Sequence, residues 1–215
     1  MWIAWAFSLD NWRHPLRHSG CTGVRFCVQS GERWRGAVRA KRGMGEEMAT
    51  DMDHQIVKDL TAAGIDYITS VPCKQLAGVI EVLDETPAIM HMPSNKEDEG
   101  MGLCAGAFMG GMKPAIVMQN TALGVVVNTL ATLIQFYQIP LPMLISYRGE
   151  VGEPVACQVE MALHTKAILN QLHIPTYHFH KPEDVAELPG ILEYAQMASK
   201  PVAILCDASF WRASA

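Results

Sequence analysis

The sequence lacks the features that mark several common classes of protein. No apolar run approaches the ~20 residues needed to cross a bilayer, and no basic residues precede the apolar N-terminus as they do in a secretory signal. The phosphate-binding pattern Gly-x-x-x-x-Gly-Lys-Ser/Thr does not occur. The formal net charge is −5, which argues against nucleic acid as the main partner. We therefore expect a soluble, cytoplasmic protein that binds neither membrane nor nucleic acid.

Cysteine chemistry is also limited. None of the six cysteines belongs to a C-x-x-C pair, which favours free thiols over a disulfide framework or a zinc site. Cys73 follows a predicted strand and is either a nucleophile or, as we favour, a packed thiol. His178 and His180 share one side of a predicted strand, but no further ligands stand at zinc spacing. We expect these histidines to face solvent and predict no metal site.

Residues 1–48 differ in composition from the rest of the chain. They hold eight basic and four acidic residues, and four of the five tryptophans, without helical or strand periodicity. The composition favours a disordered or non-native extension, and a basic arm for an acidic partner is the alternative. We expect residues 49–215 to form a single domain.

From Thr50 onward, short apolar runs alternate with segments of helical periodicity. Continuous apolar strands are typical of a parallel sheet that is covered on both faces. The pattern predicts an α/β fold, in which a six-stranded parallel sheet has helices on both faces. Ligands bind such sheets beyond the carboxyl ends of the strands. The predicted strands span 66–71, 88–92, 114–118, 142–147, 174–179 and 201–206, and the predicted helices about 51–63, 76–83, 94–109, 122–137, 161–172 and 182–198.

Two predicted helices are unusual. The segment 122–137 is apolar on nearly every side, more than a domain of this size easily covers. The segment 94–109 carries glycines, each of which weakens a helix by about 1 kcal/mol relative to alanine. Close approach to another backbone would compensate. A subunit interface is favoured for 122–137, whereas for the glycines an intramolecular contact and an interface or cofactor contact stay open.

The start of the second of these segments is rich in carboxylates. Ser94 or Asn95 is expected to cap the helix, and Glu97, Asp98 and Glu99 then fall in its first turn, where the helix dipole favours negative charge. A carboxylate beside a dry, closely packed helix is suited to acid–base or hydrogen-bonding chemistry near neutral pH.

Four motifs in order resemble one family. They are Ser70-Val71-Pro72-Cys73, Asn95-Lys96-Glu97 with Gly102-Leu103-Cys104-Ala105-Gly106, Met118-Gln119-Asn120-Thr121-Ala122-Leu123-Gly124 and Tyr147-Arg148-Gly149-Glu150. With these segments, the chain resembles, over about residues 50–210, the pyrimidine-binding domain of thiamine-diphosphate (ThDP) decarboxylases acting on sulfopyruvate or phosphonopyruvate.

The resemblance implies a role for one carboxylate. In the family, the catalytic glutamate stands nine residues before the last glycine of the second motif, which is Gly106 here. Counting back gives Glu97, and Glu99 is the alternative. This glutamate hydrogen-bonds the aminopyrimidine ring of ThDP, which activates the cofactor for attack on a 2-oxo acid.

The resemblance and the strand-end positions together nominate the other site residues. Glu97, Asn120 and Thr121 are expected near the cofactor. Arg148 is expected either to bind a substrate anion or to pair with Glu150 or Glu153. The full set of candidate substrate residues is Ser70, Pro72, Cys73, Asn95 and Arg148.

One motif of the family is missing. ThDP enzymes bind the diphosphate and Mg²⁺ with a Gly-Asp-Gly segment of a second domain, and this chain has no such segment. The resemblance therefore implies an α subunit that works with a β subunit in a hetero-oligomer. It also implies that the partner subunit holds Mg²⁺. A phosphonopyruvate decarboxylase subunit, a non-catalytic ligand-binding protein of the same fold and a flavodoxin-like nucleotide module are the alternatives.

Overall fold

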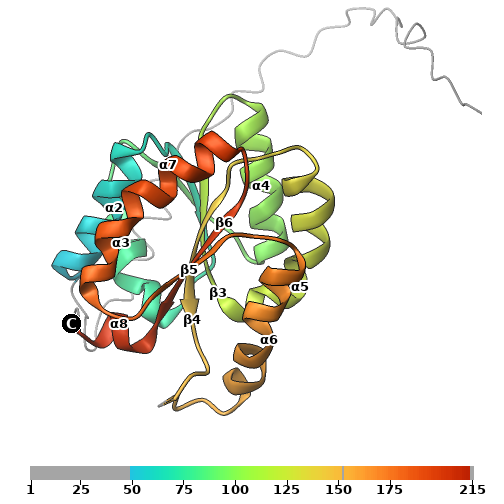
Figure 1. The fold of residues 1–215 in the computed structure, drawn as a ribbon. Coiled ribbons are helices and arrows are strands. Elements are labelled where there is room, and N and C mark those ends of the chain that lie inside the picture. Colours follow the sequence, from blue (N-terminus) through green and yellow to red (C-terminus); the bar gives the residue numbers. More distant parts are fainter. Residues whose placement is uncertain (1–48, 152, 214–215) are drawn as a thin grey trace, which may run out of the picture. The chain divides into compact units, whose positions relative to one another are not determined.

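The structure is a computed structural model, and it describes residues 49–151 and 153–213. The prediction made for residues 1–48 lies outside these residues. The described part is an α/β fold whose six strands are all parallel, in the order β2-β1-β3-β4-β6-β5 (Figure 1). The predicted fold class is thus confirmed.

The strands and helices alternate along the chain much as predicted. The strands are β1 (Tyr67–Ser70), β2 (Met90–Pro93), β3 (Pro114–Gln119), β4 (Pro142–Tyr147), β5 (Thr176–Phe179) and β6 (Val202–Asp207). The α-helices are α2 (Asp51–Ala62), α3 (Ala77–Glu85), α4 (Glu97–Met109), α5 (Leu123–Thr129), α6 (Cys157–Gln171), α7 (Leu188–Ala198) and α8 (Ala208–Ala213). Short 3₁₀ segments cover Lys74–Leu76, Asn120–Ala122 and Pro182–Glu187, and a π-helical segment covers Leu130–Gln135.

Two helical layers cover the sheet, and the strand residues alternate between them. Val117 and Leu144 point into a core shared with α2, α3 and α7. Met118 and Ile145, one residue further along each strand, point into a second core shared with α4, α5 and α6. This is the period-two alternation of a strand. Helices lie on both sides of the sheet (Figure 1). The central strands β3, β4 and β6 are buried on both faces and are therefore almost continuously hydrophobic.

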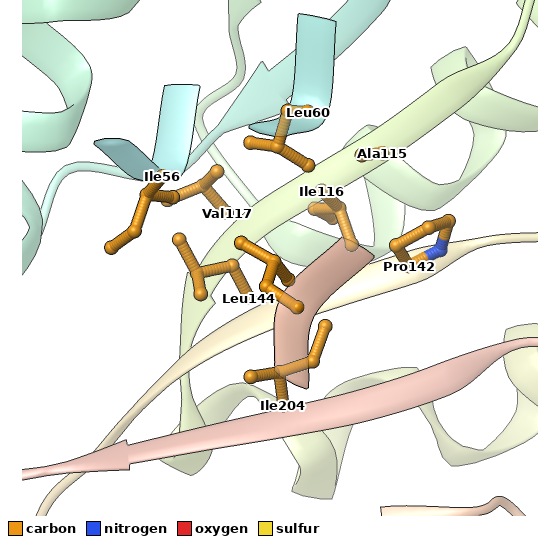
Figure 2. A pocket seen from close by; sticks show the side chains of 9 residues that line it. Ile56, Leu60, Ala115, Ile116, Val117, Pro142, Leu144 and Ile204 are labelled. Carbon is orange, nitrogen blue, oxygen red and sulfur yellow. The ribbon is translucent and has the colours of Figure 1, made fainter. Parts of the chain in front are cut away.

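The first of these cores is tightly filled. Figure 2 shows Ile56 and Leu60 of α2 facing Leu144 and Ile204 of the sheet around a small void. The void has a volume of about 10 Å³ and an almost wholly apolar lining. That is room for at most one water molecule, which would have few polar partners there. The void is therefore a packing defect and not a ligand site.

The structure differs from the sequence-based expectations in two helices. The segment predicted as one helix over 182–198 is 3₁₀-helical up to Glu187 and α-helical from Leu188. The segment predicted over 122–137 begins at the end of the 3₁₀ segment Asn120–Ala122, is α-helical over Leu123–Thr129 and continues as the π-helical segment Leu130–Gln135. A π-helical stretch rotates the following side chains relative to an α-helix. No helix of the described residues is long and apolar enough to traverse a bilayer.

Candidate active site

The carboxyl ends of the strands bring most of the predicted site residues to one edge of the sheet. Ser70 ends β1 and lies in register with Pro93 of β2 and Val117 of β3. Gln119 ends β3 and lies in register with Ser146 of β4. The four motifs therefore meet along this edge, because parallel strands all end on the same side.

Glu97 is the first residue of α4, directly beyond β2. Its side chain is half-buried, and none of the described residues forms a hydrogen bond or ion pair with it. Asp98 and Glu99 are exposed, and the Glu99 carboxylate accepts the backbone N–H of Asn95 at 3.2 Å. Of the two candidates, Glu97 is thus less exposed than Glu99 and has no partner within residues 49–151 and 153–213.

The helix cap differs from the prediction. The N-cap residue of α4 is Lys96, and its side chain makes no capping bond. Ser94 is buried, and its hydroxyl donates to the carbonyl of Lys96 at 3.1 Å. The expectation that Ser94 or Asn95 caps the helix was wrong, because Ser94 lies beneath the first turn and Asn95 is one residue too early.

The glycines of α4 lie on two different sides of the helix, one against the sheet and one exposed. A Cβ on Gly100 would lie 3.0 Å from Ser94 Oγ and 3.2 Å from both Ile116 Cδ1 and Thr69 Cγ2, so this glycine allows the helix to approach β1 and β3. Gly102 and Gly106 are exposed, and a Cβ on either would meet no atom within 4 Å. The intramolecular contact therefore explains Gly100 only.

Ser70 is fully buried and is held by a histidine that the sequence did not single out. Its hydroxyl lies 2.8 Å from Nε2 of His91, and Nδ1 of His91 lies 2.7 Å from a carboxylate oxygen of Asp84. The arrangement has the order of a Ser–His–Asp triad. However, the Ser70 side chain has no access to solvent, so here the three residues join β1 to β2 and α3.

Cys73 lies in a polar contact network. Its sulfur is 3.4 Å from Oε1 of Gln119 and 3.2 Å from Oγ of Ser146. Nε2 of Gln119 donates to Oγ1 of Thr121 at 2.7 Å. Cys73 is half-buried and Pro72 is exposed. The predicted packed thiol is thus at the edge of the sheet, where polar neighbours surround it and part of it stays accessible.

Asn120 is fully buried, and its side chain fastens the loop after β4. Nδ2 donates to the carbonyl oxygen of Arg148 at 3.0 Å and to Oγ1 of Thr165 at 3.1 Å. Oδ1 accepts the backbone N–H of Arg148 at 3.0 Å. Both N–H bonds of the amide are thereby used. In this structure, Asn120 positions Arg148 and presents no free donor to a ligand.

Arg148 forms the ion pair that the sequence analysis gave as an alternative. Its Nε donates to Oε2 of Glu153 at 2.6 Å, and its Nη2 donates to Oε1. The same carboxylate accepts the backbone N–H of Gly149 and of Val155. These hydrogen bonds, that from Arg148 first, lower the pKa of Glu153 to about 2. Arg148 keeps three further N–H bonds for another acceptor, since a guanidinium has five.

A second group of titratable side chains lies at the ends of β4, β5 and β6. Asp207 ends β6 and is buried, and its Oδ2 contacts Nδ1 of His180 and lies 3.4 Å from Nε2 of His178. One ligand atom from each of these residues and from Glu150 lies within 4.8 Å of the others.

The prediction for the two histidines is therefore right for one and wrong for the other. The His180 side chain is 58% exposed, but the His178 side chain is only 16% exposed. Burial, followed by the positive charge of Lys166, lowers the pKa of His178 to about 4. Sequence spacing missed the cluster because Glu150 and Asp207 stand 27 or more residues from either histidine in the chain.

The layer of α4, α5 and α6 also exposes large apolar side chains. On α5 and its continuation, Val125 is 60% exposed and Phe136 is 72% exposed. Leu163 of α6 is 70% exposed and Met109 of α4 is 61% exposed. The exposed Val125 and Phe136 meet the sequence-based expectation that the helix 122–137 carries more apolar surface than the domain covers.

Comparisons with known proteins identify the family. The chain is 43% identical over 165 residues to the sulfopyruvate decarboxylase subunit alpha of Methanothermobacter thermautotrophicus, covering 76% of this chain and 100% of that protein. It is 37% identical to the subunit alpha of Methanococcus maripaludis, covering 73% and 94%. The chain belongs to the sulfopyruvate decarboxylase alpha-subunit family. The resemblance stated from the motifs is confirmed.

More distant relatives fit the same assignment. The chain is 32% identical to a phosphonopyruvate decarboxylase of Streptomyces viridochromogenes, but this match covers 46% of the chain and 25% of that protein. Among solved structures, a 2-oxoglutarate:ferredoxin oxidoreductase from Magnetococcus marinus matches with a TM-score of 0.57 at 12% identity, covering 83% of this chain and 34% of that one. That likeness supports the fold alone. A search of protein-family models found no match.

Proposed function

We propose that this chain is the α subunit of a ThDP-dependent sulfopyruvate decarboxylase, which converts sulfopyruvate to sulfoacetaldehyde and CO₂ together with a β subunit. The observation that carries the proposal is the carboxylate of Glu97. It stands at the position that the family motif gives to the catalytic glutamate, at the ligand-binding edge of the sheet. It is half-buried and has no partner among the described residues.

The residues present fit one part of ThDP. An aminopyrimidine ring needs a carboxylate for its ring nitrogen, and Glu97 places a carboxylate at the helix start that no residue of the described part of the chain engages. The diphosphate and Mg²⁺ need a different set of ligands, for which the chain lacks the Gly-Asp-Gly segment. We infer that the β subunit supplies them. When bound, the cofactor supplies the electron sink that a 2-oxo acid needs in order to lose CO₂.

Each side chain of this subunit then has a limited task. Glu97 holds or shares a proton with the pyrimidine nitrogen, and enclosure by a partner would favour this by disfavouring the bare carboxylate. Arg148, fixed by Asn120 and Glu153, directs its remaining N–H bonds to the sulfonate or carboxylate of the substrate. Between Glu97 and Arg148, the site would be lined by Cys73, Asn95, Pro72 and Thr121.

We further propose that the β subunit covers the outer surface of the α4–α6 layer. Two of the relatives are named as subunits, which implies an assembly for those proteins. In this chain, exposed Val125 and Phe136 and the open Gly102 and Gly106 lie on α4 and on α5 with its continuation. Apolar surface of this kind marks an interface in a soluble protein.

The test is reconstitution. The full chain is mixed with its β subunit, ThDP and Mg²⁺, and CO₂ release from sulfopyruvate is measured. Glu97→Gln keeps the shape but cannot hold the same proton, so we expect turnover to fall by at least about 100-fold. Asp98→Asn, which changes an exposed carboxylate one residue away, is the matched control and should leave turnover nearly unchanged.

Two results would contradict the assignment. Unchanged turnover in Glu97→Gln would remove Glu97 from the reaction. A loss of turnover in Glu99→Gln, with Glu97→Gln unaffected, would assign the role to Glu99.

Phosphonopyruvate is the second candidate substrate, because a phosphonopyruvate decarboxylase is among the relatives. A direct comparison of kcat/KM for the two acids in the same reconstituted enzyme decides between them.

A further inference from the structure

A cluster of metal-ligating side chains lies at the ends of three neighbouring strands, and the proposed decarboxylation does not use it. His178 and His180 come from β5 and its end, Asp207 from the end of β6, and Glu150 from the loop after β4. The register pairs Tyr147 of β4 with Asp207 of β6 and His178 of β5 with Leu205 of β6, which explains why these distant residues converge.

The distances suit a shared ion. One ligand atom of each residue lies within 4.8 Å of the other three. In a tetrahedral zinc site, ligand atoms at 2.0–2.2 Å from the ion lie about 3.3–3.6 Å from one another. Side-chain movements of up to about 1.5 Å therefore bring all four atoms to one centre.

Asp207 and His178 are the two most buried ligands, and the carboxylate of Asp207 is already held in place. Oδ1 of Asp207 accepts the backbone N–H of Ser209 at 2.7 Å and of Phe210 at 3.0 Å, which leaves Oδ2 to face the histidines. Metal-binding carboxylates are commonly oriented by such hydrogen bonds. Nε2 of His178 is buried and has no hydrogen-bond partner among the residues that the structure describes, although Oδ2 of Asp207 is 3.4 Å away. A buried nitrogen without a partner is costly, and an ion would satisfy it.

Lys166 now supplies positive charge at this place. Its Nζ lies 3.1 Å from Nδ1 of His178 and 3.9 Å from a carboxylate oxygen of Glu150. The side chain is 52% exposed, so it has room to move into solvent.

We propose that Glu150, His178, His180 and Asp207 form a binding site for a divalent transition-metal ion such as Zn²⁺. Two imidazoles and two carboxylates are a ligand set typical of zinc and related ions, whereas Mg²⁺ prefers oxygen ligands alone. Lys166 leaves Nδ1 of His178 when the ion binds. The ion also ties the loop that carries Arg148 to β5 and β6, because Glu150 stands two residues after Arg148.

The test is a zinc titration of the full chain by calorimetry against a competing chelator of known affinity. Residues 1–48 contain further histidines and cysteines, so the difference between variants identifies the site. His180→Gln changes an exposed side chain and should fold normally. We expect it to weaken the tightest zinc-binding step at least about tenfold. His54→Gln, an exposed histidine on α2, is the matched control and should change nothing.

A second variant separates this site from casual binding to surface histidines. Lys166→Met removes the competing charge and should tighten zinc binding several-fold. It has no such effect if zinc binds elsewhere. Mg²⁺ in millimolar excess should not displace the zinc. Equal affinity in wild type, His180→Gln and Lys166→Met would overturn the proposal. The titration needs neither ThDP nor the β subunit, so its result is independent of the proposed function.

Discussion

The two helical layers of the domain bury similar inner faces but present different outer faces. The layer of α2, α3 and α7 exposes charged residues on α2 and α3, among them Asp51, Lys58 and Asp84, and one strongly exposed apolar side chain, Met197 of α7. The layer of α4, α5 and α6 exposes Val125 and Phe136 and two glycines without side chains. Large exposed apolar side chains are thus more numerous on the α4–α6 layer, which is typical of an interface.

The two layers also differ in how their helices are stabilised locally. A helix in contact with water is stabilised by an amphipathic pattern, and α2 also has a capping box between Thr50 and Asp53. The α4–α6 layer gives up such local stabilisation at the N-cap of α4 and at Gly102 and Gly106. The apolar outer surface and the open glycines are then explained by the partner that we propose for this layer.

The largest expected effect comes from placing a charge on the apolar layer. Val125→Asp should weaken association with the β subunit by at least about 100-fold, because the interface would bury an unpaired carboxylate. The matched control is Lys58→Asp on α2, which should leave association unchanged. Light scattering coupled to size-exclusion chromatography measures the complex, and thermal unfolding checks that both variants fold. Equal association of the two variants would refute the difference between the layers.

The second effect concerns the loop that packs on α6. A Cβ on Gly149, whose φ is +96°, would lie 2.2 Å from the carbonyl oxygen of Gln158 in α6, so loop and helix are in direct contact. Glu153 fixes this loop through Arg148. Glu153→Gln should lower the free energy of unfolding by about 2 kcal/mol near pH 7, because it removes charged hydrogen bonds. Chemical denaturation measures this loss.

The same pair predicts a dependence on pH. The folded-state pKa of Glu153 is about 2, below its ordinary value of 4.5. A lowered pKa contributes stability that is fully present above about pH 4.5 and is lost as the pH falls toward 2. The difference in stability between wild type and Glu153→Gln should therefore shrink over this range. A constant difference from pH 6 to pH 3 would argue against the ion pair as its source.

The smallest effect separates the two sides of α4. Gly102→Ala adds a methyl group in open space and should stabilise the isolated chain by up to about 1 kcal/mol. Gly100→Ala has the same gain in helix propensity but places the methyl group 3.0–3.2 Å from three side-chain atoms of the core. We expect it to be less stable than Gly102→Ala by about 1 kcal/mol or more. Thermal unfolding of the two variants, compared with wild type, measures the difference.

Much of the fold was predictable because it depends on local patterns. The continuous apolar runs around Val117 and Leu144 predicted buried parallel strands, and the structure has them in a parallel sheet. The site residues were harder to predict. Glu97 was predicted by counting residues within a family motif. For Arg148 the sequence left two alternatives, binding of a substrate anion or an ion pair with Glu150 or Glu153. The pair with Glu153 could be considered because the two residues are only five positions apart in one loop.

Contacts between distant segments could not be read from the sequence. Nothing near Ser70 in the chain indicates that His91 and Asp84 would hold it. Nothing near His178 indicates Asp207 as its neighbour. These contacts arise from strand order and register, which depend on how whole elements pack and not on the spacing of residues within one element.

The sequence by itself determined the alternation of strands and helices, the family, and the carboxylate at the start of α4. These follow from hydrophobic periodicity and from motifs, which are properties of short segments. The tertiary structure alone decided which glycine of α4 faces the core, which histidine is buried and which side chains gather around Asp207. Those outcomes depend on the register of β4, β5 and β6 and on the depth at which each side chain lies, and both are fixed only when the layers pack together.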